Sequence, residues 1–342
     1  MLFAKGTVIF EKMFVKNKNI KILLNYGIGP LLFIWFSYSI YEQVKTQPRL
    51  QDALYNLRDA VTGPQSWKLY LALLLVPVNW GLEARKWQVL IKPVESIRLV
   101  SAFKAVLAGL AFSMNTPNRI GEFGGRVLYV HEGHRWKAFS LTIIGSFSQL
   151  IITLGMGLGG LAFLLLNPVT AAGIAGYFIW IRVLLYGSCL VTALLVLLYF
   201  RLGQIIKWGE KIPKARRFMQ HITVIEDIPV TILLRTISLS FVRYIIFVFQ
   251  YILLLQLFGV EVPVWHSFWL ISVLYLMLAI TPTIALAEAG IRGQVSLLLF
   301  TLVSANKFGI VGAATAIWFI NLVVPALVGS LLFLSLKIFS DK

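Results

Sequence analysis

Long apolar runs, separated by short segments rich in lysine and arginine, set the pattern of this 342-residue chain. A helix needs about 20 apolar residues to cross the hydrocarbon core of a membrane. Runs of this kind predict about six full transmembrane helices, at residues 22–41, 67–90, 139–166, 177–200, 229–258 and 308–336.

Two further apolar regions are followed by a Thr-Pro pair and are too short to cross a membrane alone. The first covers 99–114, ahead of Thr116-Pro117, and the second covers 267–280, ahead of Thr281-Pro282. A chain that turns at mid-depth and returns to the side from which it entered needs only about half the length of a full crossing. Each region therefore predicts a re-entrant helical hairpin.

The charges give the expected orientation of these segments. The chain carries 31 Lys and Arg against 14 Asp and Glu, and the cations gather between the apolar runs, as in cytoplasmic loops. Glu83, Arg85, Lys86 and Trp87 at the end of the second run are expected at the headgroup interface. We predict an integral protein of the cell (inner or plasma) membrane with both termini in the cytoplasm.

Span, hairpin, span occurs twice along the chain, at 67–166 and 229–336. The predicted topology turns the two halves in opposite directions, which makes an inverted repeat inside a single membrane domain, 1–342. The run at 22–41 is then an extra N-terminal span, and 177–200 links the halves. Inverted repeats with broken helices at the midplane recur in secondary transporters.

A short motif is written once in each half. Both copies have Thr-Pro followed by Glu-x-Gly-x-Arg, as Glu122 to Arg126 and Glu288 to Arg292. Threonine caps free backbone amides and proline fits the first helical turn, so each copy predicts a half-helix N-terminus inside the protein. The residues assigned to these breaks are Thr116, Pro117, Gly121, Gly124, Thr281, Pro282 and Gly290.

Arginines beside a helix N-terminus are suited to binding a phosphate. Charges inside a membrane cost about 2.5–3.5 kcal/mol each on insertion scales, so these groups indicate a protein-lined or wet cavity. The candidate headgroup-binding residues are Arg119, Glu122, Arg126, Glu288 and Arg292, with Arg243 and Gln250 as candidate cavity lining.

A structural interpretation stays open beside this one. Glu122 with Arg126 and Glu288 with Arg292 are spaced i to i+4, so each pair can satisfy itself as a salt bridge on one helical face. The glycines can serve close helix packing alone, and Arg243 and Gln250 can bond neighbouring spans instead of lining a cavity.

Other classes of function find little support in the sequence. No Walker-type loop, serine triad or zinc-protease motif occurs, the only cysteine is Cys189, and His131 with His134 is a weak metal signal. We expect no enzyme activity, no cofactor and no metal. The basic residues form no soluble face for nucleic acid.

Pro117-Asn118-Arg119-Ile120-Gly121-Glu122 resembles the P-G-R-I-G-E signature of the lysylphosphatidylglycerol synthase transmembrane-region family, with Asn118 in place of the usual glycine. The segment from Pro282 to Gly290 is similar to the family's later proline-to-glutamate element. The family includes flippase domains of proteins that also aminoacylate lipids. Because the sequence ends at Lys342 without a soluble aminoacyl-transfer domain, we expect only the membrane activity.

The resemblance implies a flippase that moves an anionic or aminoacylated phospholipid, or a lipid-linked sugar, between leaflets. Its partners are then membrane lipids with anionic headgroups. Two alternatives stay open: a polyprenyl-phosphate transporter, and a non-transporting membrane partner of a separate lipid-modifying enzyme such as a glycosyltransferase or acyltransferase. A membrane-embedded transferase is a minor third alternative, and the oligomeric state is not predicted.

Overall fold

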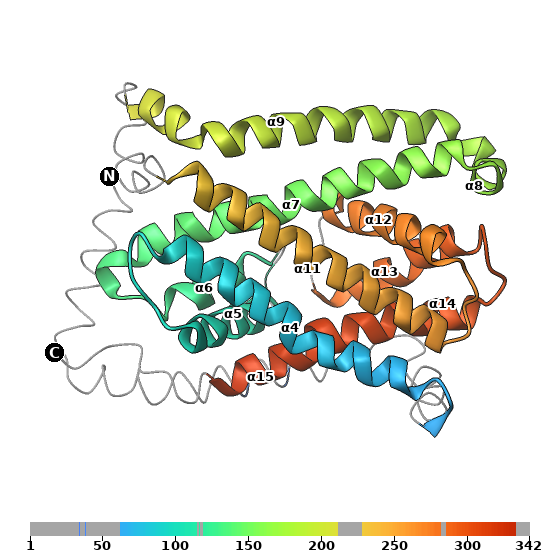
Figure 1. The fold of residues 1–342 in the computed structure, drawn as a ribbon, viewed down its shortest axis with the longest axis horizontal. Helices are drawn as coiled ribbons and strands as arrows, with labels where there is room; N and C mark the ends of the chain where they lie inside the picture. The colour runs from blue at the N-terminus through green and yellow to red at the C-terminus, as the bar shows by residue number, and fades with distance from the viewer. Residues whose placement is uncertain are drawn as a thin grey trace.

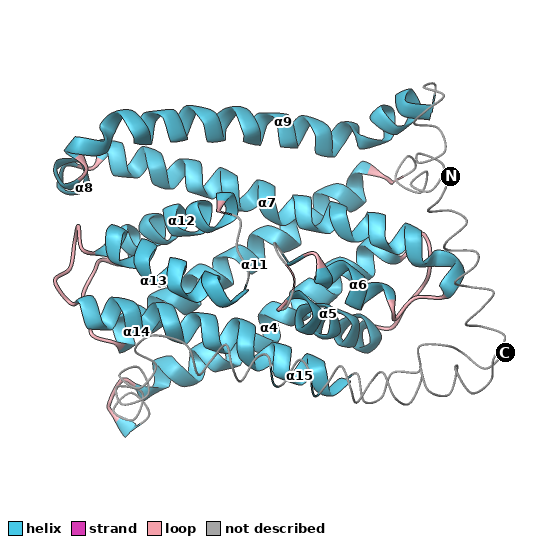
Figure 2. Ribbon diagram, turned by 180° about the vertical axis from the view of Figure 1, so that it is seen from behind, coloured by secondary structure: helices cyan, strands magenta, loops and turns pink. Residues whose placement is uncertain are grey.

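The computed structural model describes residues 62–114, 116, 119–210, 228–281 and 285–332, together with Ile34 and Tyr38. Every regular element in these residues is a helix, and the long helices lie lengthwise in an elongated bundle (Figure 1). The view from behind likewise shows no strand in the described part of the chain (Figure 2). The predicted all-α architecture is therefore confirmed. The predicted span at 22–41 lies outside the described residues, apart from Ile34 and Tyr38.

Four helical segments of the described chain are long and apolar enough to cross a membrane. They correspond to four of the predicted spans and agree with them to within a few residues over most boundaries. The segments contain α7 (Arg135–Leu166), α9 (Phe178–Glu210), α11 (Val230–Leu257), and a last helix built from α14 (Lys307–Trp318), a π-helical turn (Phe319–Val323) and α15 (Val324–Leu332).

The predicted span at 67–90 is also a helix, α4 (Ser66–Ile91), with 26 residues. At 1.5 Å per residue it is about 39 Å long, which is enough to cross a membrane. It is not among the four segments that are apolar enough to cross a membrane, because Glu83, Arg85 and Lys86 interrupt the apolar sequence of its second half.

Three of the long helices pack together in the middle of the bundle. On α11, Arg243 bonds to Glu83 while Gln250, farther along, bonds to the earlier residue Ala72, so α11 and α4 run in opposite directions. Lys86 and Trp87 of α4 reach α7. The C-terminal end of α4 and the N-terminal end of α11 therefore lie at the same end of the bundle (Figure 1).

Two helical hairpins occupy opposite ends of this bundle (Figure 1). α5 (Leu99–Ser113) and α6 (Gly121–Val127) pack against each other near the end where α4 finishes and α7 begins. α12 (Val264–Ile280) and α13 (Ala285–Phe300) pack together near the end where α11 finishes and α14 begins. We call these hairpin 1 and hairpin 2.

Capping side chains fix the connections at the hairpin 2 end. Asn306 accepts a hydrogen bond from Gly309 N (2.9 Å) and so caps α14, while its amide donates to the carbonyl of Gly259 (2.9 Å). Gly259 has a φ of +68°, in the left-handed region that glycine adopts without steric cost. The connection after α7 contains a short helix, α8 (Pro168–Gly173), capped by Asn167.

The buried apolar residues form two large clusters, one toward each end of the bundle. On α4 the change from one cluster to the other falls between Ala72 and Trp80, and on α7 it falls between Ile151 and Leu154. The buried charged groups lie near this boundary, at about the middle of the long helices. The fold thus holds a polar layer between two apolar cores.

Helix α9 lies at the side of the bundle against α7 (Figure 1). Only 11% of the residues in its apolar 18-residue stretch are buried inside the protein. Its exposed residues include Trp180, Tyr186 and Leu190. A helix with so much exposed apolar surface is suited to lipid contact, because water would make that exposure costly.

Candidate functional site

The turn of hairpin 1 carries the first copy of the motif. Thr116 Oγ1 accepts a hydrogen bond from Gly121 N (2.8 Å), the first residue of α6. The helix thus begins at Gly121, several residues after the Thr116-Pro117 pair at which the sequence predicts its start. A side chain at Gly121 would collide with the carbonyl oxygen of Phe112. Arg119 has a φ of +58°, a left-handed conformation that is uncommon for a residue other than glycine. Pro117 and Asn118 lie outside the described residues.

Glycines bring the two helices of hairpin 1 into close contact. A Cβ atom on Gly125 would lie 2.5 Å from Gly109 Cα, whereas a Cβ atom on Gly124 would meet nothing within 4 Å. The Arg126 side chain, at the next residue, passes beside Gly109, where an added Cβ atom would lie 3.1 Å from Arg126 Cγ, and it reaches Glu83 of α4. Gly125 therefore serves packing, while Gly124 faces open space.

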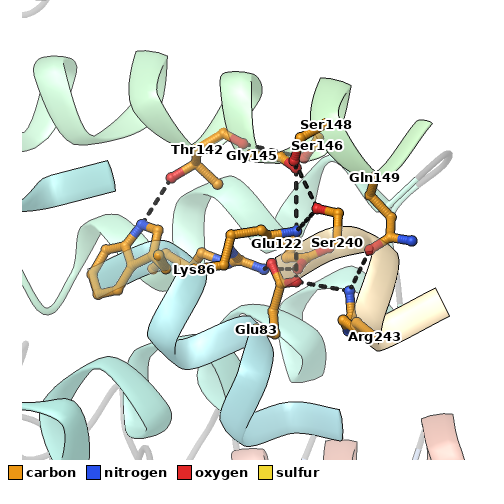
Figure 3. Close-up of polar contacts among 12 residues, drawn as sticks. Glu83, Lys86, Glu122, Thr142, Gly145, Ser146, Ser148, Gln149, Ser240 and Arg243 are labelled. Atoms are coloured by element: carbon orange, nitrogen blue, oxygen red, sulfur yellow. Dashed lines mark hydrogen bonds and ion pairs between the residues drawn. The ribbon is translucent and has the colours of Figure 1, made fainter. Parts of the chain in front are cut away.

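Arg126 joins a buried ionic cluster around Glu83 of α4, which we call the Glu83 cluster. The Glu83 carboxylate accepts from Lys86 (2.7 Å), Arg126 (2.9 Å) and Arg243 (2.7 Å). Glu122 also pairs with Arg126. Figure 3 shows Glu83 between Lys86 and Arg243. Two carboxylates thus hold three cations, and of these five residues only Glu122 is partly exposed.

The expectation that Glu83, Lys86 and Trp87 lie at the headgroup interface is wrong. Their exposed fractions are 3%, 1% and 0%. Lys86 Nζ donates to Gly145 O (3.2 Å), and Trp87 Nε1 donates to Thr142 Oγ1 (3.1 Å). Lys86 and Trp87 thus face α7, whereas the partners of Glu83 lie on α4, α6 and α11, because a buried charge needs several partners.

The second copy of the motif meets the first through Glu288. Its carboxylate accepts from Arg292 (2.7 Å), one turn further along α13, and from Arg119 (3.0 Å) in the turn of hairpin 1. The Thr281 hydroxyl donates to Met277 O (2.7 Å), a carbonyl in the last turn of α12. Pro282 lies outside the described residues. The two motifs, 166 residues apart in sequence, are thus joined by an ion pair.

A cavity of about 410 Å³ opens beside this ion pair. Its charged lining residues are Arg119, Arg243, Arg292 and Glu288, so three cations face one carboxylate. The remaining wall is mainly aromatic and apolar, with a few neutral polar groups. It includes Trp80, Tyr244, Phe247, Tyr275, Leu278, Ile317, Trp318, Gln149, Thr153 and Asn321.

Aromatic rings hold two of the cavity arginines. The Arg243 guanidinium carbon lies 4.9 Å from the Trp80 ring centroid and 5.1 Å from that of Phe247. The guanidinium carbon of Arg292 lies 5.6 Å from the Tyr275 ring centroid. Cation–π contacts restrict how these planes move, so the donors are already oriented before a ligand arrives. Such an arrangement is chemically suited to binding an anion.

The predicted site residues divide into two groups. Arg119, Arg243, Thr281, Glu288 and Arg292 line the cavity. Glu122 and Arg126 are not among the lining residues, because Arg126 turns into the Glu83 cluster. Gln250 is completely buried and donates to Ala72 O (2.8 Å), so it bonds α11 to α4.

The remaining predicted positions are the two motif glycines. A Cβ atom on Gly290 would meet nothing within 4 Å, as at Gly124. Neither glycine lines the cavity. The described residues contain no group of three His, Cys, Asp or Glu side chains that could hold a metal ion.

Sequence reasoning missed several lining residues. Trp80, Gln149 and Asn321 are isolated polar or aromatic residues within apolar runs, and only their packing reveals that they face a common cavity. The one signal that could have found Gln149 and Asn321 was an amide side chain in an otherwise apolar stretch. Such an amide is costly inside a membrane helix unless it has a hydrogen-bond partner.

The fold and the site define a class of protein: a helical membrane protein with a cation-rich internal cavity. The sequence matches the family described as Lysylphosphatidylglycerol synthase TM region over residues 23–329. That match covers most of the chain, and the protein belongs to this family. Neither a curated protein nor a solved structure gives a match.

Proposed function

We propose that this protein moves a lipid with an anionic headgroup from one leaflet of the cell membrane to the other. The observation that carries the proposal is the cavity at mid-bundle, where Arg119, Arg243 and Arg292 surround a single carboxylate. A lipid phosphate that leaves the membrane surface loses its hydration, and preoriented guanidinium groups replace it. Flippase activity fits the family to which the chain belongs.

We further propose that hairpins 1 and 2 are re-entrant and belong to two inverted halves, 67–166 and 229–336. Support comes from their location at opposite ends of the bundle and from the ion pair between Arg119 and Glu288. In this arrangement α4 is a full span, and its buried charges, Glu83 and Lys86, are paired inside the protein. Both termini are then cytoplasmic.

The same ion pair suggests how substrate binding couples to movement. Glu288 holds Arg119 of hairpin 1 and Arg292 of hairpin 2. A headgroup phosphate competes with Glu288 for both guanidinium groups. Binding therefore weakens the direct link between the halves and allows one half to rock against the other, as alternating access requires.

The test is movement of labelled lipids in proteoliposomes made with phosphatidylglycerol, a polyprenyl phosphate or a neutral phosphatidylcholine control. We expect the wild type to move an anionic lipid selectively, and Arg292→Gln to slow it about tenfold or more, since hydrogen bonds to charged groups contribute about 1.5–3 kcal/mol. Arg85→Gln is the matched control, because Arg85 is exposed on α4 and lies outside the cavity.

Three outcomes would contradict parts of this proposal. Faster movement of the polyprenyl phosphate would identify a carrier for that lipid class. Equal rates in Arg292→Gln and Arg85→Gln would remove the cavity from the mechanism. No movement of any lipid by folded protein would favour a non-transporting partner of a separate lipid-modifying enzyme.

Topology is tested separately by thiol labelling. Cys189, the only cysteine in the sequence, is exposed on α9 and is first replaced by alanine. Single cysteines at Gly133 and Lys307, both exposed, should then react from the cytoplasmic and external sides respectively. Reaction from the same side would contradict the inverted halves.

A further inference from the structure

A second pocket lies at the end of the bundle where α4 finishes and α11 begins, and the proposed function does not use it. Its volume is about 370 Å³, and it shares no lining residue with the central cavity. Its lining includes three cations, Arg85, Lys92 and Arg235, and no carboxylate among the described residues. We call it the basic pocket.

The three cations come from two helices that pack against each other and run in opposite directions. Arg85 lies on α4, and Lys92 directly follows its last residue. The two are about two helical turns apart and therefore share a face. Arg235 lies in the second turn of α11. The cations thus gather from both sides of the pocket.

The chain after α4 forms a third wall, and hydrogen bonds fix its position. Gln88 Nε2 donates to Ile97 O (2.8 Å), while the amide oxygen of Gln88 accepts from Arg85. Ser96 and Thr231, also in the lining, carry hydroxyl groups that can donate to an anion. The basic pocket is therefore a concave site built from three segments of the chain.

The cations of the basic pocket lack a protein counterion. All three are exposed, and within the described chain none has an ion-pair partner. Glu95, in the same connection, faces His131 and His134 instead. Glu83 of α4 is buried in the Glu83 cluster. Three like charges around one concave site repel one another, so an anion that enters it is stabilised.

The location favours a lipid as the source of that anion. α4 is about 39 Å long, more than the hydrocarbon core of about 30 Å, so its ends reach the headgroup layer. The positive-inside rule explains why cations gather at this end, but not why three share one site without a carboxylate. Basic pockets between transmembrane helices on the cytoplasmic side bind the headgroups of anionic lipids.

We propose that the basic pocket binds a lipid headgroup with two phosphate groups and holds it at the membrane surface. Two phosphates supply two negative charges to three cations, whereas a single phosphodiester supplies one. The inference goes beyond the proposed function, because this lipid is bound outside the central cavity and is not the one moved. Only its assignment to the cytoplasmic leaflet uses the proposed topology. Paired phosphates also occur in soluble pyrophosphate, and the test separates the two sources.

Native mass spectrometry of the purified protein in neutral detergent counts bound lipids and measures their affinities. The lipid probes are diphosphatidylglycerol with two phosphates, phosphatidylglycerol with one, and phosphatidylcholine without net charge. We expect one diphosphatidylglycerol to bind about tenfold more tightly than phosphatidylglycerol, because the second phosphate adds charge-assisted hydrogen bonds. Inorganic pyrophosphate is the soluble probe and should not displace the lipid at equal concentration.

A pair of double variants tests whether the pocket itself binds this lipid. Lys92→Gln combined with Arg235→Gln removes two of the three cations and should weaken diphosphatidylglycerol binding about tenfold or more. Arg98→Gln combined with Lys137→Gln is the matched control, because both residues are exposed near the same end and lie outside the pocket. It removes the same charge and should bind like wild type. Arg292→Gln, in the central cavity, should also leave this binding unchanged.

Three results would overturn the inference. Equal weakening by the two double variants would assign binding to the total charge at this end of the protein. Loss of diphosphatidylglycerol in Arg292→Gln would place the lipid in the central cavity. Displacement by equal pyrophosphate would assign the pocket to a free phosphate compound.

The proteoliposome assay separates failure of this inference from failure of the proposed function. Selective lipid movement by a protein that binds diphosphatidylglycerol no more tightly than phosphatidylglycerol would refute the basic pocket and preserve the flippase. Tight binding that depends on Lys92 and Arg235, in a protein that moves no lipid, would preserve the basic pocket and refute the flippase.

Discussion

In the first motif copy, Arg126 is enclosed between Glu83 and Glu122, and its side chain is 3% exposed. In the second copy, Arg292 stands at the cavity wall, and its partner Glu288 also holds Arg119 from the opposite hairpin. The same Glu-x-Gly-x-Arg pattern therefore serves a structural cluster in one half and the cavity in the other. The difference arises from α4, which places Glu83 within reach of Arg126.

The largest expected effect comes from removing the centre of the first region. Glu83→Gln leaves Lys86, Arg126 and Arg243 buried with too few carboxylates. Breaking a buried ion pair costs about 3–5 kcal/mol, so most of the variant should fail to fold or melt far below wild type in detergent. Glu122→Gln is the control, because Glu122 contacts one cation and is 20% exposed. Equal melting of Glu83→Gln and wild type would show that the Glu83 cluster contributes no stability.

The motif glycines provide a second way to separate the two copies. Gly125→Ala inserts a methyl group 2.5 Å from Gly109 Cα and should cost about 1–3 kcal/mol by overpacking hairpin 1. Gly124→Ala and Gly290→Ala, at equivalent positions of the two copies, meet nothing within 4 Å and should melt like wild type. Thermal unfolding in detergent measures all three. A loss at Gly290 as large as at Gly125 would contradict the described packing.

Glu288→Gln tests the second region directly. The variant leaves Arg119 and Arg292 without their shared carboxylate and should lose about 1–3 kcal/mol of stability in neutral detergent. An anionic lipid supplies the missing charge, so short-chain phosphatidylglycerol should restore part of the melting temperature. The same lipid should not rescue Glu83→Gln, whose cations lie largely away from the cavity. Rescue of both variants would erase the distinction between the two regions.

Much of the fold could be predicted because apolar runs report helix length. The predicted spans at 139–166 and 229–258 correspond to α7 and α11, since a membrane helix must be apolar along its whole crossing. The Thr-Pro pairs also marked both helix breaks. The apolar pattern did not delimit α13, because its first turns carry Glu288 and Arg292, which a search for apolar residues skips.

The site was harder to predict because its partners are distant in sequence. Arg126 lies 43 residues from Glu83, and Arg243 lies 160 residues from it. Near Trp87, a cluster of charges looks the same in sequence whether it faces headgroups or other helices. Only the tertiary contacts distinguish charges that face headgroups from charges that face other helices. These contacts show that Glu83 lies in the interior and not at the predicted interface.

The smallest expected effect concerns the loops that flank hairpin 1. Glu95, between α4 and α5, accepts from His131 N (3.1 Å), and its carboxylate lies 3.3 Å from His131 Nδ1 and 3.1 Å from His134 Nδ1. Partial burial raises the pKa of Glu95, but hydrogen bonds from His134 and His131 outweigh it and hold the pKa below its ordinary 4.5. These contacts connect the loops before α5 and after α6, and so close the base of hairpin 1.

The sign of the pH dependence follows from that lowered pKa. A carboxylate with a depressed folded-state pKa stabilises the fold above its ordinary pKa, and the contribution is lost as the pH falls through the lowered value. Glu95→Gln should therefore melt slightly below wild type at neutral pH. The loss in the free energy of unfolding should be less than about 1 kcal/mol, because exposed ion pairs contribute little. The two proteins should converge as the pH falls below 4.5. A difference that persisted well below pH 4.5 would show that it does not come from the charge of the Glu95 carboxylate.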